Sequence, residues 1–191
     1  MKPPFKITIK MLNLIVEISQ LVGKLEYEYE RNLHLRKENR IRSIQSFLAI
    51  ENNSLTLEQV TDIINGKKVF GKPQEIREVK NAYEAYETIL NLEPYSLKDF
   101  LMAHKLMMDD LVSSAGRIRS KDVGIYDSSG HVIHMGARPQ YVAGLLQELF
   151  EWGRTDETPD LIKSCAIHYE IEMIHPFEDG NAPLRYHAKA A

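Results

Sequence analysis

Apolar residues recur every three or four positions along most of this chain, and that spacing limits the fold more than any other feature. On an α-helix such spacing gathers apolar side chains on one face, which must then pack against another element. The pattern starts near residues 8, 25, 57, 73, 96, 139 and 158. We therefore expect about seven helices that pack on one another, and a mainly α fold class.

Local signals mark where these helices begin and end. Thr56 and Gln59 have the spacing of a capping box, and Gly66 follows at the position of a helix C-terminus. Pro73 and Pro139 precede renewed helical spacing, because proline is tolerated in the first turn. The remaining expected boundaries are Thr8, Ser96 and Thr158 as N-caps, Gly23 after a first helix that ends near Leu21, a second helix over 25–49, and a last helix that opens with Pro159 and reaches His175.

One segment departs from the helical spacing. Val123 and Ile125 precede the turn-forming sequence Asp127-Ser-Ser-Gly130, and Val132 follows it. β-branched residues on both sides of such a turn predict a short β-hairpin. A mainly helical chain with one small hairpin is thus the expected architecture.

Composition bounds the function. The chain has 191 residues, of which 43% are hydrophobic and 27% charged, with a net charge of -3. These values fit a globular protein, and they give no reason to expect nucleic-acid binding, which needs a concentrated basic face. No apolar run is long enough for a membrane span, and the N-terminus lacks the apolar core of a signal peptide. With Cys165 as its single cysteine, the chain is expected to be cytoplasmic.

The densest chemistry lies in His175-Pro-Phe-Glu-Asp-Gly-Asn181, where the last helix ends. A neutral imidazole at His175 can accept a proton from a hydroxyl. Asp179 can hold Mg²⁺ together with substrate phosphates, and Gly180 permits close approach of a backbone or an anion. Asn181 can cap a following helix whose N–H groups bind an anion. Phe177 between them is expected to anchor the loop to the core.

Spacing alone leaves open whether this segment is a phosphate-and-base site or a structural loop. The chain lacks the histidine and cysteine patterns of zinc sites and both glycine-rich nucleotide signatures. The other histidines of the chain are expected to be structural.

A resemblance to a known family narrows this choice. Residues 175–181 resemble the first seven positions of the Fic family motif, H-x-F-x-(D/E)-G-N-G-R-x-x-R. The segment Ser114–Arg119 and the following hairpin resemble the substrate-binding flap of that family, and Arg138-Pro139 resembles the segment after the flap. The segment 50–60 resembles the region of the inhibitory helix. The chain is therefore similar to Fic proteins over roughly residues 35–181.

The resemblance implies an organisation: a helical extension over 1–34 and a Fic-like helical bundle over 35–191. Within the bundle it implies an inhibitory-helix region near 40–52, a flap near 119–136 and a motif loop at 175–181. Because the family domain continues for at least one more helix, the bundle is expected to be C-terminally incomplete.

The resemblance also implies an activity, the transfer of AMP from ATP to a Ser, Thr or Tyr hydroxyl of a target protein. In that scheme His175 is the catalytic base, Asp179 holds Mg²⁺, and Glu51 is inhibitory. The nucleotide would lie against the motif loop at Phe177, Gly180 and Asn181. The flap would bind the target as an added strand, through Val123, Ile125, Val132 and Ile133. ATP, Mg²⁺ and the target are the implied partners, with no nucleic acid, no membrane and a possible homodimer.

The chain departs from the motif after Asn181. The G-R-x-x-R of the family falls on Ala182, Pro183, Leu184, Arg185 and Tyr186, so neither arginine is in register. Arginine binds phosphate in a bidentate manner that neither proline nor tyrosine reproduces. We therefore expect AMP transfer to be impaired in this chain. Two alternatives stay open: a catalytically inactive Fic-like module that binds nucleotide or protein, and a relative that transfers a different phosphate-linked group.

Overall fold

The computed structural model describes residues 2–29, 33–126 and 129–181, and it confirms the mainly α class. Its helices and strands, in chain order, are α1 (Ile9–Tyr29), α2 (Leu33–Ile50), α3 (Leu57–Ile64), α4 (Pro73–Thr88), the short 3-10 helix η1 (Ile89–Asn91), α5 (Leu97–Met108), β1 (Gly124–Tyr126), β2 (Val132–Met135), α6 (Pro139–Thr155) and α7 (Asp160–Ile174). Among the described residues, no helix combines the length and the apolar character needed to cross a bilayer.

Most of the expected helix boundaries are confirmed. The Thr56 hydroxyl accepts a hydrogen bond from the Gln59 N–H at 3.2 Å, and the Gln59 side chain accepts one from the Thr56 N–H at 2.9 Å. Ser96 caps α5 by accepting from the Asp99 N–H. Thr8 likewise accepts from the Met11 N–H at the start of α1. Each cap satisfies a backbone donor that has no partner within the helix.

Three boundary predictions are wrong. The second helix begins at Leu33 and not near Leu25. Gly23 does not end the first helix, because α1 continues through it to Tyr29. Glycine in a helix interior costs only about 1 kcal/mol relative to alanine, and nothing after it interrupts the helix. Thr158 does not cap α7 either, since its N–H and its hydroxyl both donate to the Asp156 carboxylate. The helix therefore begins one residue later than expected, at Asp160, with Pro159 as its N-cap.

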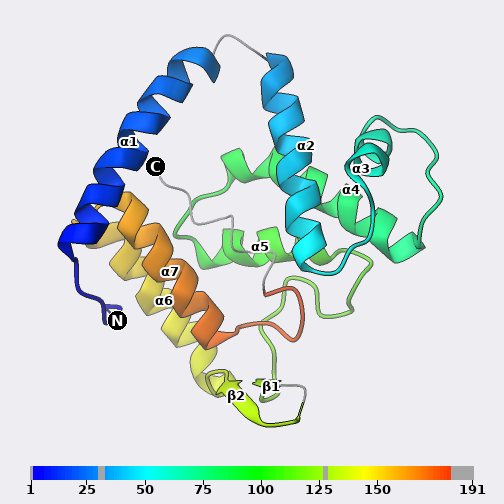
Figure 1. The fold of residues 1–191 in the computed structure, drawn as a ribbon. Helices are drawn as coiled ribbons and strands as arrows, with labels where there is room; N and C mark the ends of the chain where they lie inside the picture. Colours follow the sequence, from blue (N-terminus) through cyan, green and yellow to red (C-terminus); the bar gives the residue numbers. More distant parts are fainter. Residues whose placement is uncertain (1, 30–32, 127–128, 182–191) are drawn as a thin grey trace.

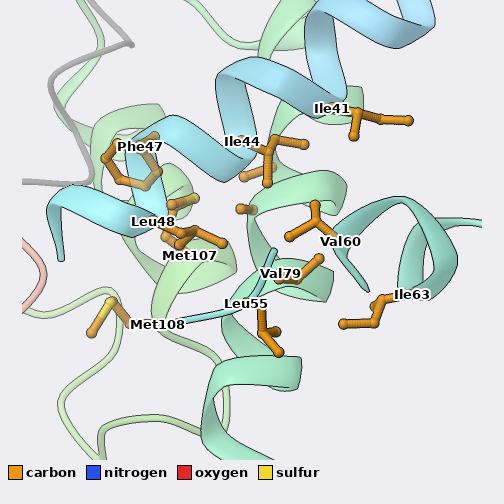
Figure 2. Close-up of a cluster of buried hydrophobic side chains, with 12 residues drawn as sticks. Ile41, Ile44, Phe47, Leu48, Leu55, Val60, Ile63, Val79, Met107 and Met108 are labelled. Atoms are coloured by element: carbon orange, nitrogen blue, oxygen red, sulfur yellow. The ribbon is translucent and has the colours of Figure 1, made fainter. Parts of the chain in front are cut away.

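Two apolar cores meet on α5. The first lies between α2, α3 and α4 and the C-terminal end of α5, and Figure 2 shows its side chains converging from these elements. The second lies between α6 and α7 and the N-terminal half of α5. Figure 1 shows α6 and α7 side by side on one flank and α2 to α4 on the other, with α5 between them. Phe100 contributes to the second core and Met107 and Met108 to the first, so α5 joins both halves.

The segment after α7 returns to the second core. Phe177 has no solvent exposure and its ring lies 5.4 Å from the ring of Phe100. The chain thus leaves α7 and is immediately fixed again by an aromatic anchor. This is the role expected for Phe177 in the loop, and it determines where the neighbouring polar residues lie.

We predict that Phe177→Ala lowers the free energy of unfolding by about 3–5 kcal/mol, because it leaves a cavity in the second core. The matched control is Phe70→Ala, since the Phe70 side chain is 98% exposed. Urea denaturation of both variants measures the difference. Equal stability of the two variants would contradict the anchoring role of Phe177.

Candidate active site at the end of helix α7

His175 ends α7 in a left-handed backbone conformation. Its φ is 51°, and its N–H still donates to the carbonyl of Ile171 at 2.8 Å. A non-glycine residue at positive φ is strained and persists only where the surrounding contacts require it. This conformation turns the chain out of α7 and into the motif loop, which we define as residues 175–181.

The His175 imidazole is half-buried, and its Nδ1 has no hydrogen-bond partner among the residues that the structure describes. Burial lowers the pKa of His175 below its usual value of 6.5, and the nearby Arg119 charge acts in the same direction. The ring is therefore neutral near pH 7. A neutral imidazole can accept a proton, as a general base must, but the unpaired Nδ1 is itself buried, so a substrate proton would have to be taken by Nε2.

Asn181 closes the motif loop. Its side-chain oxygen accepts from the Phe177 N–H at 2.8 Å, and its side-chain nitrogen donates to the Phe177 carbonyl at 2.9 Å. Asn181 is 5% exposed, and both polar groups of its side-chain amide are used in hydrogen bonds within the loop. A cap on a following helix would involve residues from Ala182 on, which lie outside the described residues.

Gly180 is required by the packing of the loop on α5. Its φ is 71°, and a Cβ at this position would lie 2.5 Å from the sulfur of Met108. Its N–H donates to the Asp179 carboxylate at 2.7 Å. An anion that approaches this N–H must therefore displace the carboxylate of Asp179 first, which limits the expected anion-binding role of the turn.

His104, which was expected to have only a structural role, also contacts the motif loop. His104 of α5 stacks on Phe177, with ring centroids 3.7 Å apart and an angle of 4° between the planes. Its Nδ1 accepts from the Gly116 N–H at 2.8 Å, and its Nε2 lies 3.0 Å from the Asp179 carbonyl. The first bond leaves the proton on Nε2, which then donates to Asp179. Only its position on the apolar side of α5 could have pointed to this contact.

The expected inhibitory residue faces the motif loop. Glu51 directly follows α2, and it lines a cavity of about 170 Å³ together with Asp179 and Gly180. Pockets that enclose a drug-sized ligand measure roughly 300–1,000 Å³. The enclosed part of this cavity is thus smaller than a typical site for a whole nucleotide. His175 is not among its lining residues.

The cavity is acidic. Glu51, Glu78 and Asp179 line it, and no lysine or arginine does so within the part of the chain that the structure describes. These negatively charged carboxylates repel a phosphate, so a phosphate could bind here only together with a cation. Among the described residues no cluster of three ligating side chains could hold a metal by itself, and the role of Asp179 in binding Mg²⁺ stays a prediction.

The hairpin expected for the flap is confirmed. Gly124 pairs with Met135 and Ile125 with His134 in an antiparallel ladder, with a bulge before Tyr126. The tip at 127–128 lies outside the described residues. The four expected target-binding residues lie on or directly beside this hairpin, and their role stays a prediction: Val123, Ile125, Val132 and Ile133.

Comparison with known proteins decides the family. The Fic/DOC family profile matches residues 94–185. A solved Fic family protein from Desulfovibrio desulfuricans G20 is 43% identical, covers 98% of this chain and 58% of that chain, and superimposes with a TM-score of 0.91. Residues 94–185 form a Fic domain. The matched region includes α5, the hairpin, α6, α7 and the motif loop, so the site residues of the motif loop and the flap all lie within it, whereas Glu51 and Glu78 lie before it.

Curated relatives point the same way. Protein adenylyltransferase fic-1 of Caenorhabditis elegans is 27% identical over 184 residues, which cover 90% of this chain and 35% of that protein. A solved Fic-1 chain from the same organism is 25% identical, with a TM-score of 0.68, and covers 92% of this chain and 57% of that chain. The chain thus spans about a third of the length of the curated relatives it matches.

We predict that acidification destabilises the Fic domain as the pH falls below about 6.5. Burial lowers the pKa of both His104 and His175 in the folded state, so the unfolded chain binds protons first and is stabilised as the pH falls. Each group can contribute at most about 1.4 kcal/mol per pH unit. Urea denaturation across this range measures the effect.

His175→Gln should weaken this pH dependence, because it removes one of the two histidines whose pKa is lowered in the folded state. Stability that stays constant or increases on acidification from neutral pH to about pH 5.5 would contradict the lowered pKa values.

Proposed function

We propose that this chain derives from a protein adenylyltransferase, which transfers AMP from ATP to a hydroxyl group of a target protein, and that its own transfer activity is impaired. The observation that carries the first part is the half-buried, neutral His175 beside a flap, within a Fic domain whose curated relatives are named protein adenylyltransferases. The second part follows from Pro183 and Tyr186, which stand where the motif has arginines.

In the proposed reaction His175 accepts the proton of the target hydroxyl, whose oxygen then attacks the α-phosphorus of ATP. The bond between that phosphorus and its bridging oxygen breaks, and pyrophosphate leaves. Mg²⁺ at Asp179 would neutralise charge on the nucleotide phosphates. Strand addition at Val123, Ile125, Val132 and Ile133 of the flap would bring the hydroxyl to His175.

The proposed impairment is electrostatic. A phosphate at the motif loop approaches Glu51, Glu78 and Asp179, and the two arginines that would offset these charges are absent from the sequence. An arginine that stabilises a phosphoryl-transfer transition state contributes roughly 10³–10⁵ in rate. A general base contributes about 10²–10⁴ in rate, so His175 alone does not offset the loss.

The proposed division of the chain into an extension over 1–34 and a Fic-like domain from 35 on places Glu51 within that domain.

We predict that purified chain transfers almost no label from α-labelled ATP to protein. The combined substitutions Ala182→Gly, Pro183→Arg and Tyr186→Arg should raise the rate by at least about 10³-fold, because they return two phosphate-binding cations. Adding His175→Ala to this variant should remove the gain. Gel-based detection of the label measures all three proteins.

Three outcomes would contradict parts of this proposal. Robust transfer by the unmodified chain, lost in His175→Ala, would refute the impairment. If the arginine-restored variant binds ATP but transfers nothing, the inactive nucleotide-binding module becomes the better description. Transfer of a phosphate without the adenosine would favour the third possibility, a different phosphate-linked group.

We predict that Glu51→Gln strengthens binding of ATP with Mg²⁺ about fivefold. The substitution removes one negative charge from the cavity that contains Asp179 and Gly180, and a single charge a few ångströms away contributes about 1 kcal/mol in water. The control is Glu58→Gln in the first turn of α3, away from the cavity. Calorimetry measures both affinities, and equal values for the two variants would show that Glu51 has no inhibitory effect here.

A further inference from the structure

One guanidinium group holds together the segments that converge on His175. Arg119 precedes the hairpin and is only 3% exposed. Its Nε donates to the His175 carbonyl at 2.6 Å, and one terminal nitrogen donates to the Lys121 carbonyl at 2.7 Å. The other terminal nitrogen donates to the Ile174 carbonyl at 3.2 Å and also to the Ala137 carbonyl.

These four carbonyl groups belong to three different segments. Ile174 and His175 form the end of α7, Lys121 enters the hairpin, and Ala137 leaves it. Backbone hydrogen bonds reinforce the same junction, because the Arg119 N–H donates to the Pro176 carbonyl at 3.0 Å and the Ala137 N–H donates to the Ile174 carbonyl at 3.1 Å. A shift of the hairpin base relative to His175 would therefore break several bonds to one side chain.

The junction is also packed without spare room. A Cβ on Gly136 would lie 2.8 Å from a terminal nitrogen of Arg119 and 3.1 Å from the Cβ of His175. The absence of a side chain at Gly136 therefore lets the end of β2 approach His175 directly. Since Gly136 also donates its N–H to the Val123 carbonyl at 3.0 Å, both hairpin strands are fixed relative to His175.

The planar guanidinium suits this task in a way that lysine does not. It presents five N–H donors in a fixed geometry, and it can thus serve four carbonyls at once. A buried cation is costly unless its donors are satisfied. If this position served stability alone, an apolar side chain could fill it. The Arg119 guanidinium instead bonds to both ends of the hairpin and to the end of α7, and it thereby fixes their relative position.

We propose that Arg119 is a positioning residue that sets the distance between the flap and the imidazole of His175. This inference rests on the proposed function, in which a target strand is added to the flap and its hydroxyl must reach His175. Arg119 acts through the carbonyl groups of His175 and of the hairpin ends, and touches no reacting atom. The flap and the base thereby form one rigid unit.

The test uses nuclear magnetic resonance on the unmodified chain and on Arg119→Lys and Arg119→Ala. The first readout is the Overhauser contact between the Gly136 Hα protons and the Hβ protons of His175, which are neighbours in the structure. The second is hydrogen exchange of the Ala137 N–H relative to core amides of α6. Arg117→Ala is the matched control, because Arg117 donates to the Ser113 carbonyl on the surface and not to the hairpin.

We expect the contact to be strong in the unmodified chain and in Arg117→Ala, weaker in Arg119→Lys and absent in Arg119→Ala. Exchange of the Ala137 N–H should accelerate by about tenfold or more in Arg119→Ala, since hydrogen bonds to a charged donor are the stronger class. Arg119→Lys should lie between the two. Its retained charge reaches fewer carbonyls.

A lower melting temperature with an unchanged contact and unchanged relative exchange would overturn the proposal and assign Arg119 to stability alone. If Arg119→Ala does not fold, Arg119→Lys decides by the same criterion. Neither readout requires nucleotide transfer. The positioning role can therefore fail while the proposed activity stands, and the activity can fail while the positioning role stands.

Discussion

The four carbonyl groups that surround the Arg119 guanidinium come from parts of the chain that are distant in sequence. They bring the hairpin against the end of α7, and they support the strained backbone of His175 at that point. Without such support a histidine at positive φ would relax, and the loop would leave α7 in another direction. The placement of the imidazole beside the flap thus depends on a buried cation outside the motif loop.

Local signals in the sequence were sufficient for most of the helices. Thr56 with Gln59, and Ser96 with Asp99, form caps that depend on residues three positions apart, so no distant contact was needed to predict them. The hairpin was equally local. Gly23 misled the prediction because a lone glycine weakens a helix without ending it, and Thr158 did so because a competing acceptor, Asp156, lies two residues away.

Parts of the site could not be predicted in this way. His175, Asp179 and Gly180 lie close together in the sequence and were recognisable as a group, but the partners that orient them are distant in the sequence. His104 precedes Asp179 by 75 positions and Arg119 precedes His175 by 56, and the position of His104 on the apolar side of α5 predicts a buried histidine but not which residue it contacts. The sequence also could not indicate that the Gly180 N–H is already bonded to the Asp179 carboxylate, because that depends on a side-chain rotamer.

The motif loop and the missing arginines are physically separable. Phe177 anchors the loop in the second core, and Asn181 closes it. Arg119 binds the carbonyl of its first residue, and His104 binds the carbonyl of Asp179. All of these residues precede Ala182. Pro183 and Tyr186, which stand where the motif has arginines, supply no positive charge for a phosphate. In the function proposed above, the loop keeps its geometry while its affinity for a triphosphate falls, so a partial motif and an acidic cavity can occur in the same chain.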